Sequence, residues 1–213
     1  MSEQLGKIEK PSVEQYGAGR KLYFVPLIFS PTEPTADLLE KVNGYWDQVE
    51  AQVTNLELKL RKVHKVYHEL IALGGEDGVK GIEELNKESY RITKGRLDKG
   101  AELQLIEDGE LLAEFMDWSR CLAVGLQSQK AFTTVYESYV QAQKKRNSHI
   151  AKQIDETLKD GEAGILLMRE GHQVQFPSDI QVFYVAPPGL DEIKRWLRER
   201  EAEAQTGNQT TQT

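Results

Sequence analysis

A stripe of apolar side chains between residues 38 and 70 places the strongest constraint on how this chain can fold. Its members recur at intervals of three and four residues, about 3.6 on average, which is the period of an α-helix. No proline interrupts the stripe, and glycines at 74 and 75 end it as helices commonly end. The members are Leu38, Val42, Tyr45, Val49, Val53, Leu56, Leu60, Val63, Tyr67 and Leu70. We therefore predict one helix from about 35 to 73, roughly 58 Å long at 1.5 Å per residue.

A helix of this length needs a partner for its apolar face, and a second stripe downstream can supply one. This stripe lies between residues 109 and 146 and continues with helical spacing to Leu158. It comprises Leu112, Phe115, Met116, Leu122, Leu126, Phe132, Tyr136, Tyr139 and Val140. We predict that the two stripes bury each other in a long antiparallel, coiled-coil-like helical hairpin at about 35–160.

Short apolar runs near both ends of the chain predict strands. The first is "KLYFVPLIF" at 21–29, and Pro26 places it at a sheet edge or a bulge because proline cannot donate a ladder hydrogen bond. Three further runs lie at 164–170, 172–176 and 179–185, of which the second can pair back on the first. Whether the sheet is parallel or antiparallel stays open.

The fold class that follows is α/β or α+β, and predominantly helical. A small sheet from 21–29 and 164–186 carries the inserted hairpin, and an amphipathic helix follows at 189–205. We predict a flexible arm at 1–20, a single domain at 21–205 and a disordered tail at 206–213, because both ends are polar and have little to bury.

Composition limits the possible locations and partners. No apolar run approaches the roughly 20 residues of a membrane helix, and the N-terminus has no apolar signal segment. Cys121 is the single cysteine, so a cytoplasmic location is expected. The net charge of −7 argues against a cationic surface for DNA or for an anionic membrane. We expect no membrane and no DNA partner.

Two histidines, His64 and His68, lie one helical turn apart and are the weak metal candidates. The zinc-protease motif needs glutamate directly after the first histidine, and Lys65 stands there instead. The pattern favours polar flank positions on a long helix over a metal site. Nucleophile elbows, phosphate-binding lysine loops and dinucleotide glycine motifs are also absent from the sequence. We therefore predict no catalytic residue, metal or cofactor.

The candidate ligand-binding residues are Arg169, Glu170 and His172, where an apolar strand emerges. Ligands of open α/β sheets favour the carboxyl ends of strands, where such groups can bind an anion or act as acid and base. Asp179 and residues 186–188 would complete the site if the strands are parallel. The alternative is a charged β-turn in which Gly171 adopts a positive φ.

Two basic clusters could bind a nucleic acid or a partner, unless they only keep a helix solvated. One is Lys59, Lys62 and Lys65, and the other is Lys144, Lys145 and Arg146. Over about 50 residues toward the C-terminus, the order helix, "GILLM" strand, "VFYV" strand, helix resembles α/β modules that bind structured RNA in ribosomes and release factors. This resemblance implies an RNA or ribosome partner.

Three hypotheses for the function follow. The preferred one is a non-catalytic cytoplasmic interaction protein, whose projecting hairpin binds a protein partner or a second copy in a homo-oligomer. The alternative is an RNA- or ribosome-associated factor that uses the basic clusters and the C-terminal α/β unit. The third is a small ligand-binding protein or enzyme with its site at Arg169, Glu170 and His172. A concave pocket around Arg169 and His172 would favour the ligand, and a bare turn would favour the scaffold.

Overall fold

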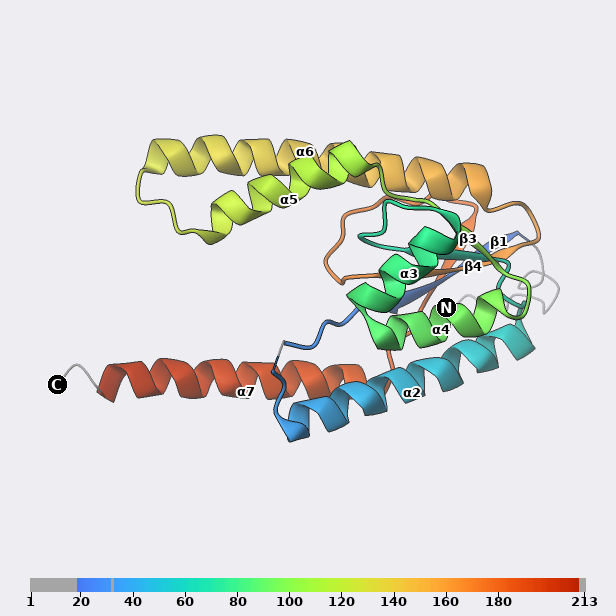
Figure 1. Ribbon diagram of the computed structural model, residues 1–213, viewed down its shortest axis with the longest axis horizontal. Helices are drawn as coiled ribbons and strands as arrows, with labels where there is room; N and C mark the ends of the chain where they lie inside the picture. The colour runs from blue at the N-terminus through green and yellow to red at the C-terminus, as the bar shows by residue number, and fades with distance from the viewer. Residues whose placement is uncertain (1–18, 32, 211–213) are drawn as a thin grey trace, which may run out of the picture.

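Five parallel strands form the centre of the molecule, in the order β3-β2-β4-β1-β5. The computed structural model describes residues 19–31 and 33–210 (Figure 1). The strands are β1 (Arg20–Pro26), β2 (Lys65–His68), β3 (Glu102–Gln104), β4 (Ala163–Met168) and β5 (Ile180–Tyr184). The helices are α2 (Ala36–Lys59), α3 (Gly75–Leu85), α4 (Lys87–Leu97), α5 (Gly109–Ala123), α6 (Gln129–Thr157) and α7 (Pro188–Thr210).

The predicted fold class, with its long hairpin, is wrong because the first apolar stripe does not form one helix. Helix α2 has Thr35 as its N-cap, which agrees with the predicted start near residue 35, but the helix ends at Lys59, and residues 65–68 form strand β2. A strand of a parallel sheet is covered on both faces and is therefore apolar at consecutive positions. In a segment as short as "KVYH" that run also fits a helical period, so periodicity cannot separate the two structures.

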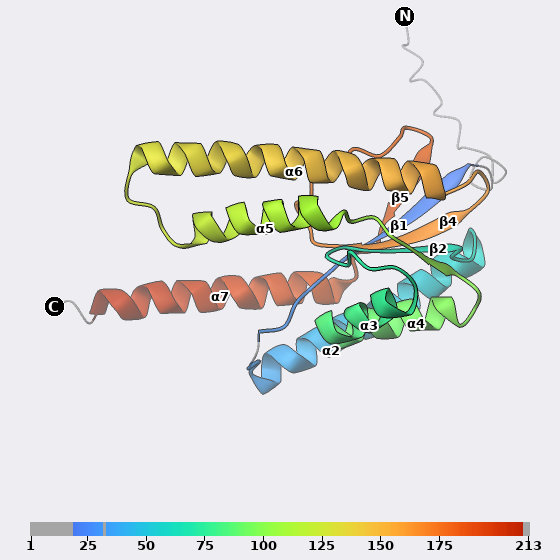
Figure 2. The ribbon, with the colours of Figure 1, turned by 45° about the horizontal axis from the view of Figure 1, so that its top comes forward.

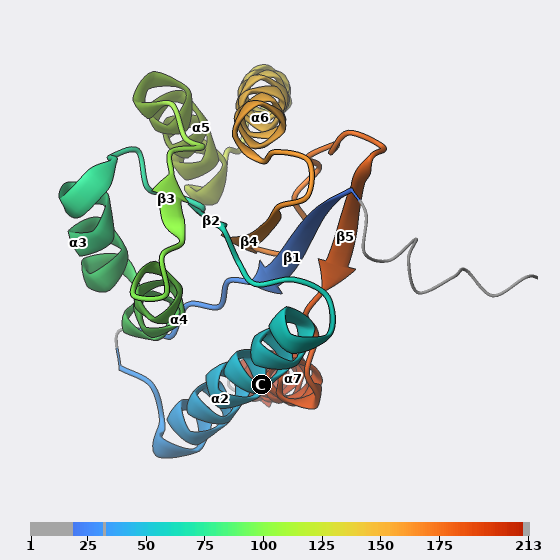
Figure 3. The same cartoon turned by 90° about the vertical axis from the view of Figure 1, so that its right-hand side faces the viewer.

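The second stripe forms α5 and α6, which lie against each other as neighbouring antiparallel helices (Figure 2). Gly125, with φ of +74°, lies in the turn between them. Helix α2 is on the opposite face of the sheet (Figure 3). The predicted contact between the two stripes is therefore impossible, because the sheet separates them.

The sheet carries one apolar core on each face, because successive side chains of a strand point in opposite directions. Tyr23 and Val25 of β1 contribute to the core beneath α2 and α7, whereas Leu22 and Phe24 contribute to the core beneath α6. The same alternation occurs in β4. The molecule thus has three layers, helix, sheet and helix (Figure 3).

The position of β1 corrects a second prediction, since this strand lies between β4 and β5 and not at an edge. Phe24 directs its carbonyl to the N–H of Val185, the residue directly after β5. Pro26 is the last residue of β1, and it lies beyond the last residue of β1 that pairs with β5. The missing N–H of this proline therefore costs the sheet no ladder bond.

The expected hairpin of 164–170 with 172–176 is also wrong. β4 pairs in parallel with β1 and β2, and residues 172–176 belong to the connection that crosses to β5.

The two ends of the chain differ in how much the structure describes. Of the predicted arm at 1–20, residues 1–18 lie outside the described residues, and Arg20 opens β1. Helix α7 continues to Thr210, beyond the predicted end at 205, and residues 211–213 lie outside the described part. Among the described residues, no helix is both long and apolar enough to cross a membrane.

Candidate ligand site at the carboxyl edge of the sheet

The strand order creates a crevice between the carboxyl ends of β2 and β4. The chain leaves β2 through α3 and α4 toward β3 on one side, and leaves β4 toward β5 on the other. Ligands of open α/β sheets bind where neighbouring strands diverge in this way. The first residue after β2 is Glu69, and the first after β4 is Arg169.

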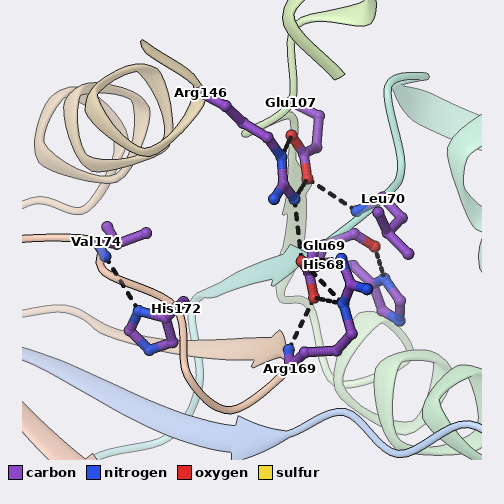
Figure 4. Close-up of polar contacts among 8 residues, drawn as sticks. All are labelled: His68, Glu69, Leu70, Glu107, Arg146, Arg169, His172 and Val174. Atoms are coloured by element: carbon purple, nitrogen blue, oxygen red, sulfur yellow. Dashed lines mark hydrogen bonds and ion pairs between the residues drawn. The ribbon is translucent and has the colours of Figure 1, made fainter. Parts of the chain in front are cut away.

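Glu69 and Arg169 form the centre of a buried ion cluster (Figure 4). The backbone N–H of Arg169 donates to Glu69 Oε2 at 2.8 Å, and Arg169 Nη2 donates to Oε1 at 3.0 Å. Burial raises the pKa of the Glu69 carboxyl, but hydrogen bonds and charge from Arg169 and the charge of Arg146 outweigh burial. The pKa is therefore below its ordinary value, and the carboxylate is ionised at neutral pH.

Helix α6 contributes Arg146, which is only 3% exposed and joins Glu69 to Glu107. Its Nη2 donates to Glu69 at 3.1 Å, and its Nε donates to Glu107 Oε2 at 2.9 Å. The guanidinium carbon lies 4.8 Å from the centre of the Phe115 ring, which holds the other side of the cation. Arg146 is thus fixed from three elements.

The turn after β2 is shaped by the same cluster. Leu70 has φ of 69°, and it is the non-glycine residue with a positive φ in the described part of the chain. Its N–H donates to Glu107 Oε1 at 2.9 Å. A leucine in the left-handed region is unfavourable by itself, so surrounding contacts must maintain it. The hydrogen bond to Glu107 is one such contact at the edge of the crevice.

Each arginine of the cluster keeps one unused nitrogen. Within residues 19–31 and 33–210, no hydrogen bond or ion pair involves Nη1 of Arg146 or Nη1 of Arg169. Nη1 of Arg146 is not among the fully buried polar atoms that lack a partner, and the Arg146 side chain lines a cavity. Arg169 lines the same cavity and is 43% exposed.

This cavity has a volume of about 210 Å³ and lies between the sheet edge, α5 and α6. Its lining comprises Glu69, Phe115, Ser119, Tyr139, Gln143, Arg146, Asn147, Met168, Arg169, Glu170, Gly171 and His172. A larger groove of about 760 Å³ shares Asn147 and His172 with it and continues along α6. We call the first the arginine cavity and the second the α6 groove.

His172 separates the arginine cavity from the α6 groove. Its ring is edge-on to Phe24, at 4.8 Å between centroids, and its Nδ1 accepts the N–H of Val174 at 3.3 Å. Burial lowers the pKa of His172, against a weaker opposing effect of the Glu69 charge, so the ring is neutral at pH 7. Nε2 then carries the hydrogen. The ring points away from the Glu69–Arg169 pair (Figure 4).

The structure therefore brings only part of the predicted ligand set together. Arg169, Glu170 and His172 all line the arginine cavity, although Glu170 is engaged by Tyr184 and by Lys194 at 2.8 Å. Asp179 is excluded. It precedes β5 and pairs with Arg20 at 2.7 Å, at the amino edge of the sheet.

The two histidines proposed as weak metal candidates do not lie on a helix. His64 precedes β2, where its Nδ1 accepts the N–H of Ala163 at 3.2 Å. His68 ends β2 and is buried, with its Nε2 2.9 Å from Ser89 Oγ. Four residues along a strand separate them by roughly 13 Å. Among the described residues, no group of three or more His, Cys, Asp and Glu side chains is placed to hold a metal ion.

The two predicted basic clusters do not form a common surface. Lys59 ends α2, Lys62 follows it, and Lys65 pairs with Glu102 at 2.6 Å at the amino end of β2. The other cluster lies on α6, across the sheet. Its members differ in environment: Lys144 lines the α6 groove, Lys145 pairs with Glu114, and Arg146 is buried.

Sequence reasoning missed the groups that build the site. Glu69 and Glu107 were not among the predicted residues, and Arg146 was predicted only as a member of a basic cluster. The available signal was that Glu69 directly follows a short apolar run. Comparison with protein-family models, curated proteins and solved structures gave no match for this chain.

Proposed function

We propose that this chain binds a small ligand through an anionic group, which the unused Nη1 atoms of Arg146 and Arg169 hold in the arginine cavity. The observation that carries this proposal is that both arginines, each with one terminal nitrogen that makes no hydrogen bond in the described part of the chain, line one cavity at the point where β2 and β4 diverge. Guanidinium groups bind carboxylate and phosphate oxygens in a fixed planar geometry.

The buried glutamates support this proposal because they fix the arginines before any ligand arrives. Glu69 is held by both guanidinium groups, and Glu107 holds Arg146 from the other side. A receptor whose side chains are already ordered loses less conformational entropy on binding. Charge-assisted hydrogen bonds contribute about 1.5–3 kcal/mol each.

His172 carries a further donor at the border between the arginine cavity and the α6 groove. With Nδ1 occupied by Val174, a neutral ring presents Nε2–H as a hydrogen-bond donor. The proposal includes no covalent step, and it concerns recognition only.

The test is binding of a panel of small anions, namely acetate, benzoate, N-acetylalanine and inorganic phosphate, measured by calorimetry. We expect at least one member to bind, and Arg169→Gln to weaken it at least tenfold. Arg120→Gln is the matched control, since Arg120 is an exposed arginine on α5 that forms an ion pair with Asp117. Equal binding by Arg169→Gln and wild type, or no binding by any member, would overturn the proposal.

The two other functional hypotheses stay predictions. The interaction-protein hypothesis has lost the long hairpin that motivated it, although a protein partner or a second copy is not tested. The two basic clusters on which the RNA hypothesis depends are separated by the sheet.

A further inference from the structure

Resting on the proposed ligand site, we infer that its anionic group is the C-terminal carboxylate of a peptide, whose preceding residues lie in the α6 groove. Three properties of this surface fit the end of a peptide. The charge of the cluster fits a carboxylate, the polar lining of the groove fits a peptide backbone, and an apolar row on α6 fits apolar side chains.

The charge of the cluster favours one negative charge over two. Glu69 and Glu107 already neutralise Arg146 and Arg169, so the four groups sum to zero. A carboxylate adds one uncompensated charge to this partly buried site, whereas a phosphate dianion adds two. Each added charge carries a desolvation cost. The two oxygens of a single carboxylate supply enough acceptors for the one free nitrogen of each arginine.

The α6 groove matches the peptide backbone that would follow this carboxylate. Asn147, Gln173 and Gln175 line it together with the hydroxyl of Ser148. A side-chain amide carries both donors and an acceptor, so it can pair with the N–H and C=O groups of an extended chain. The volumes of the arginine cavity and the α6 groove, about 210 and 760 Å³, suit a ligand of a few residues.

An exposed apolar row extends the groove along α6 toward the N-terminal end of that helix. Val140 lines the groove, and Tyr136 and Phe132 follow at intervals of four residues on the same face. These side chains are 41%, 49% and 42% exposed, and the rings of Phe132 and Tyr136 are stacked with centroids 5.9 Å apart. Apolar side chains upstream of the carboxylate can pack on this row.

The orientation of the peptide follows from this arrangement. The carboxylate lies at the sheet edge, and the chain leaves along α6 toward the part of the helix that extends past the sheet (Figure 2). We define the peptide class as one with a free C-terminus preceded by apolar residues. Lys144, between Val140 and Ser148 on this face, favours an acidic side chain within the same segment.

The test uses fluorescein-labelled pentapeptide pools with apolar residues at the last three positions, measured by fluorescence anisotropy with the full chain. Each pool is made with a free C-terminus and with an amidated one. We expect amidation to weaken binding at least tenfold, because an amide has no negative charge for the arginines.

A second variant separates this inference from the proposed function. Tyr136→Ser changes an exposed side chain, so the fold should be retained, which circular dichroism checks. We expect it to weaken the free-carboxylate pool about fivefold and to leave N-acetylalanine binding unchanged, whereas Arg169→Gln weakens both. If small carboxylates bind but the pool binds no more tightly, or amidation has no effect, the peptide inference fails and the anion site stands. If neither binds, both fail.

Discussion

Arg96 and Arg146 are both almost completely buried, and each is held by two glutamates, but their surroundings differ. Arg96 of α4 lies against α2 and donates to Glu50 and Glu57, with one further bond to the carbonyl of Ile92. Its terminal nitrogens are all engaged, and its Nε is a buried atom without a partner. Arg146 leaves a terminal nitrogen at a cavity, beside a second arginine.

The difference shows that burial and charge pairing do not by themselves identify a binding site. The Arg96 cluster joins two helices within one layer. The Arg146 cluster joins a helix to the carboxyl edge of the sheet, and its two arginines line a cavity. Position in the topology and unused donors therefore distinguish the two clusters.

The largest difference between the two clusters should appear in the free energy of unfolding when each arginine is replaced by methionine. Arg146→Met leaves the fully buried Glu107 with the N–H of Leu70 alone, so we expect a loss of roughly 3–5 kcal/mol in the free energy of unfolding. Arg96→Met should cost less, about 1.5–3 kcal/mol, because the Glu50 side chain is 35% exposed and can be hydrated. Urea unfolding measures both values.

A second substitution checks the cause of this loss. In the Arg146→Met background, Glu107→Gln removes the unpaired charge and should restore part of the stability. Equal losses for both arginine variants, or no rescue, would show that the two clusters do not differ in the way we describe.

A smaller effect on stability should come from the protonation of His68, a residue of β2 that lies between the Arg96 cluster and the Arg146 cluster. Its side chain faces Ser89 of α4, whereas that of the next residue, Glu69, faces α6. Burial lowers the pKa of His68 to about 4, against a smaller opposing effect of Glu69. The unfolded chain takes up a proton below about pH 6.5 but the folded chain does not, so stability falls as the pH decreases from 6.5 to 4. The loss is about 3 kcal/mol.

The measurement is urea unfolding at several pH values between 7 and 4 for wild type and His68→Gln. The variant cannot gain this proton and should have a flatter profile. His172→Gln is the control, because His172 is half-buried and its removal should change the slope less. A His68→Gln profile as steep as wild type would contradict the assignment.

The sequence predicted the longer elements better than the shorter ones. β1, β4 and β5 fall on apolar runs of the predicted kind, and α2 begins at the predicted start near residue 35. β2 and β3 have four and three residues, which is too short for any period to show. Because β2 was not predicted, its apolar residues were assigned to the end of the predicted helix. That one error produced the wrong fold class.

The sequence placed the candidate site at the end of β4 but did not identify most of the residues that build it. Arg169 and His172 were identified because a polar group at the end of an apolar run is a local feature. Glu69, Glu107 and Arg146 come from three segments that only the strand order brings together. Without β2 and β3, no argument from local pattern places them beside β4.

The smallest expected effect concerns the orphan polar atoms on the α4 face. In the described part of the chain, three buried side-chain atoms have no hydrogen-bond partner: the hydroxyl oxygen of Thr93, Trp46 Nε1 and Arg96 Nε. Thr93→Val removes a hydroxyl that gained no hydrogen bond on folding, so the free energy of unfolding should rise by about 1 kcal/mol. Ser89→Ala, one turn earlier on α4, should lower it by about the same amount, because His68 Nε2 loses its partner. Chemical denaturation of both variants gives opposite shifts of the midpoint if unpaired and paired hydroxyls differ as described. Shifts of the same sign would mean that shape, and not hydrogen bonding, decides the packing of α4 on the sheet.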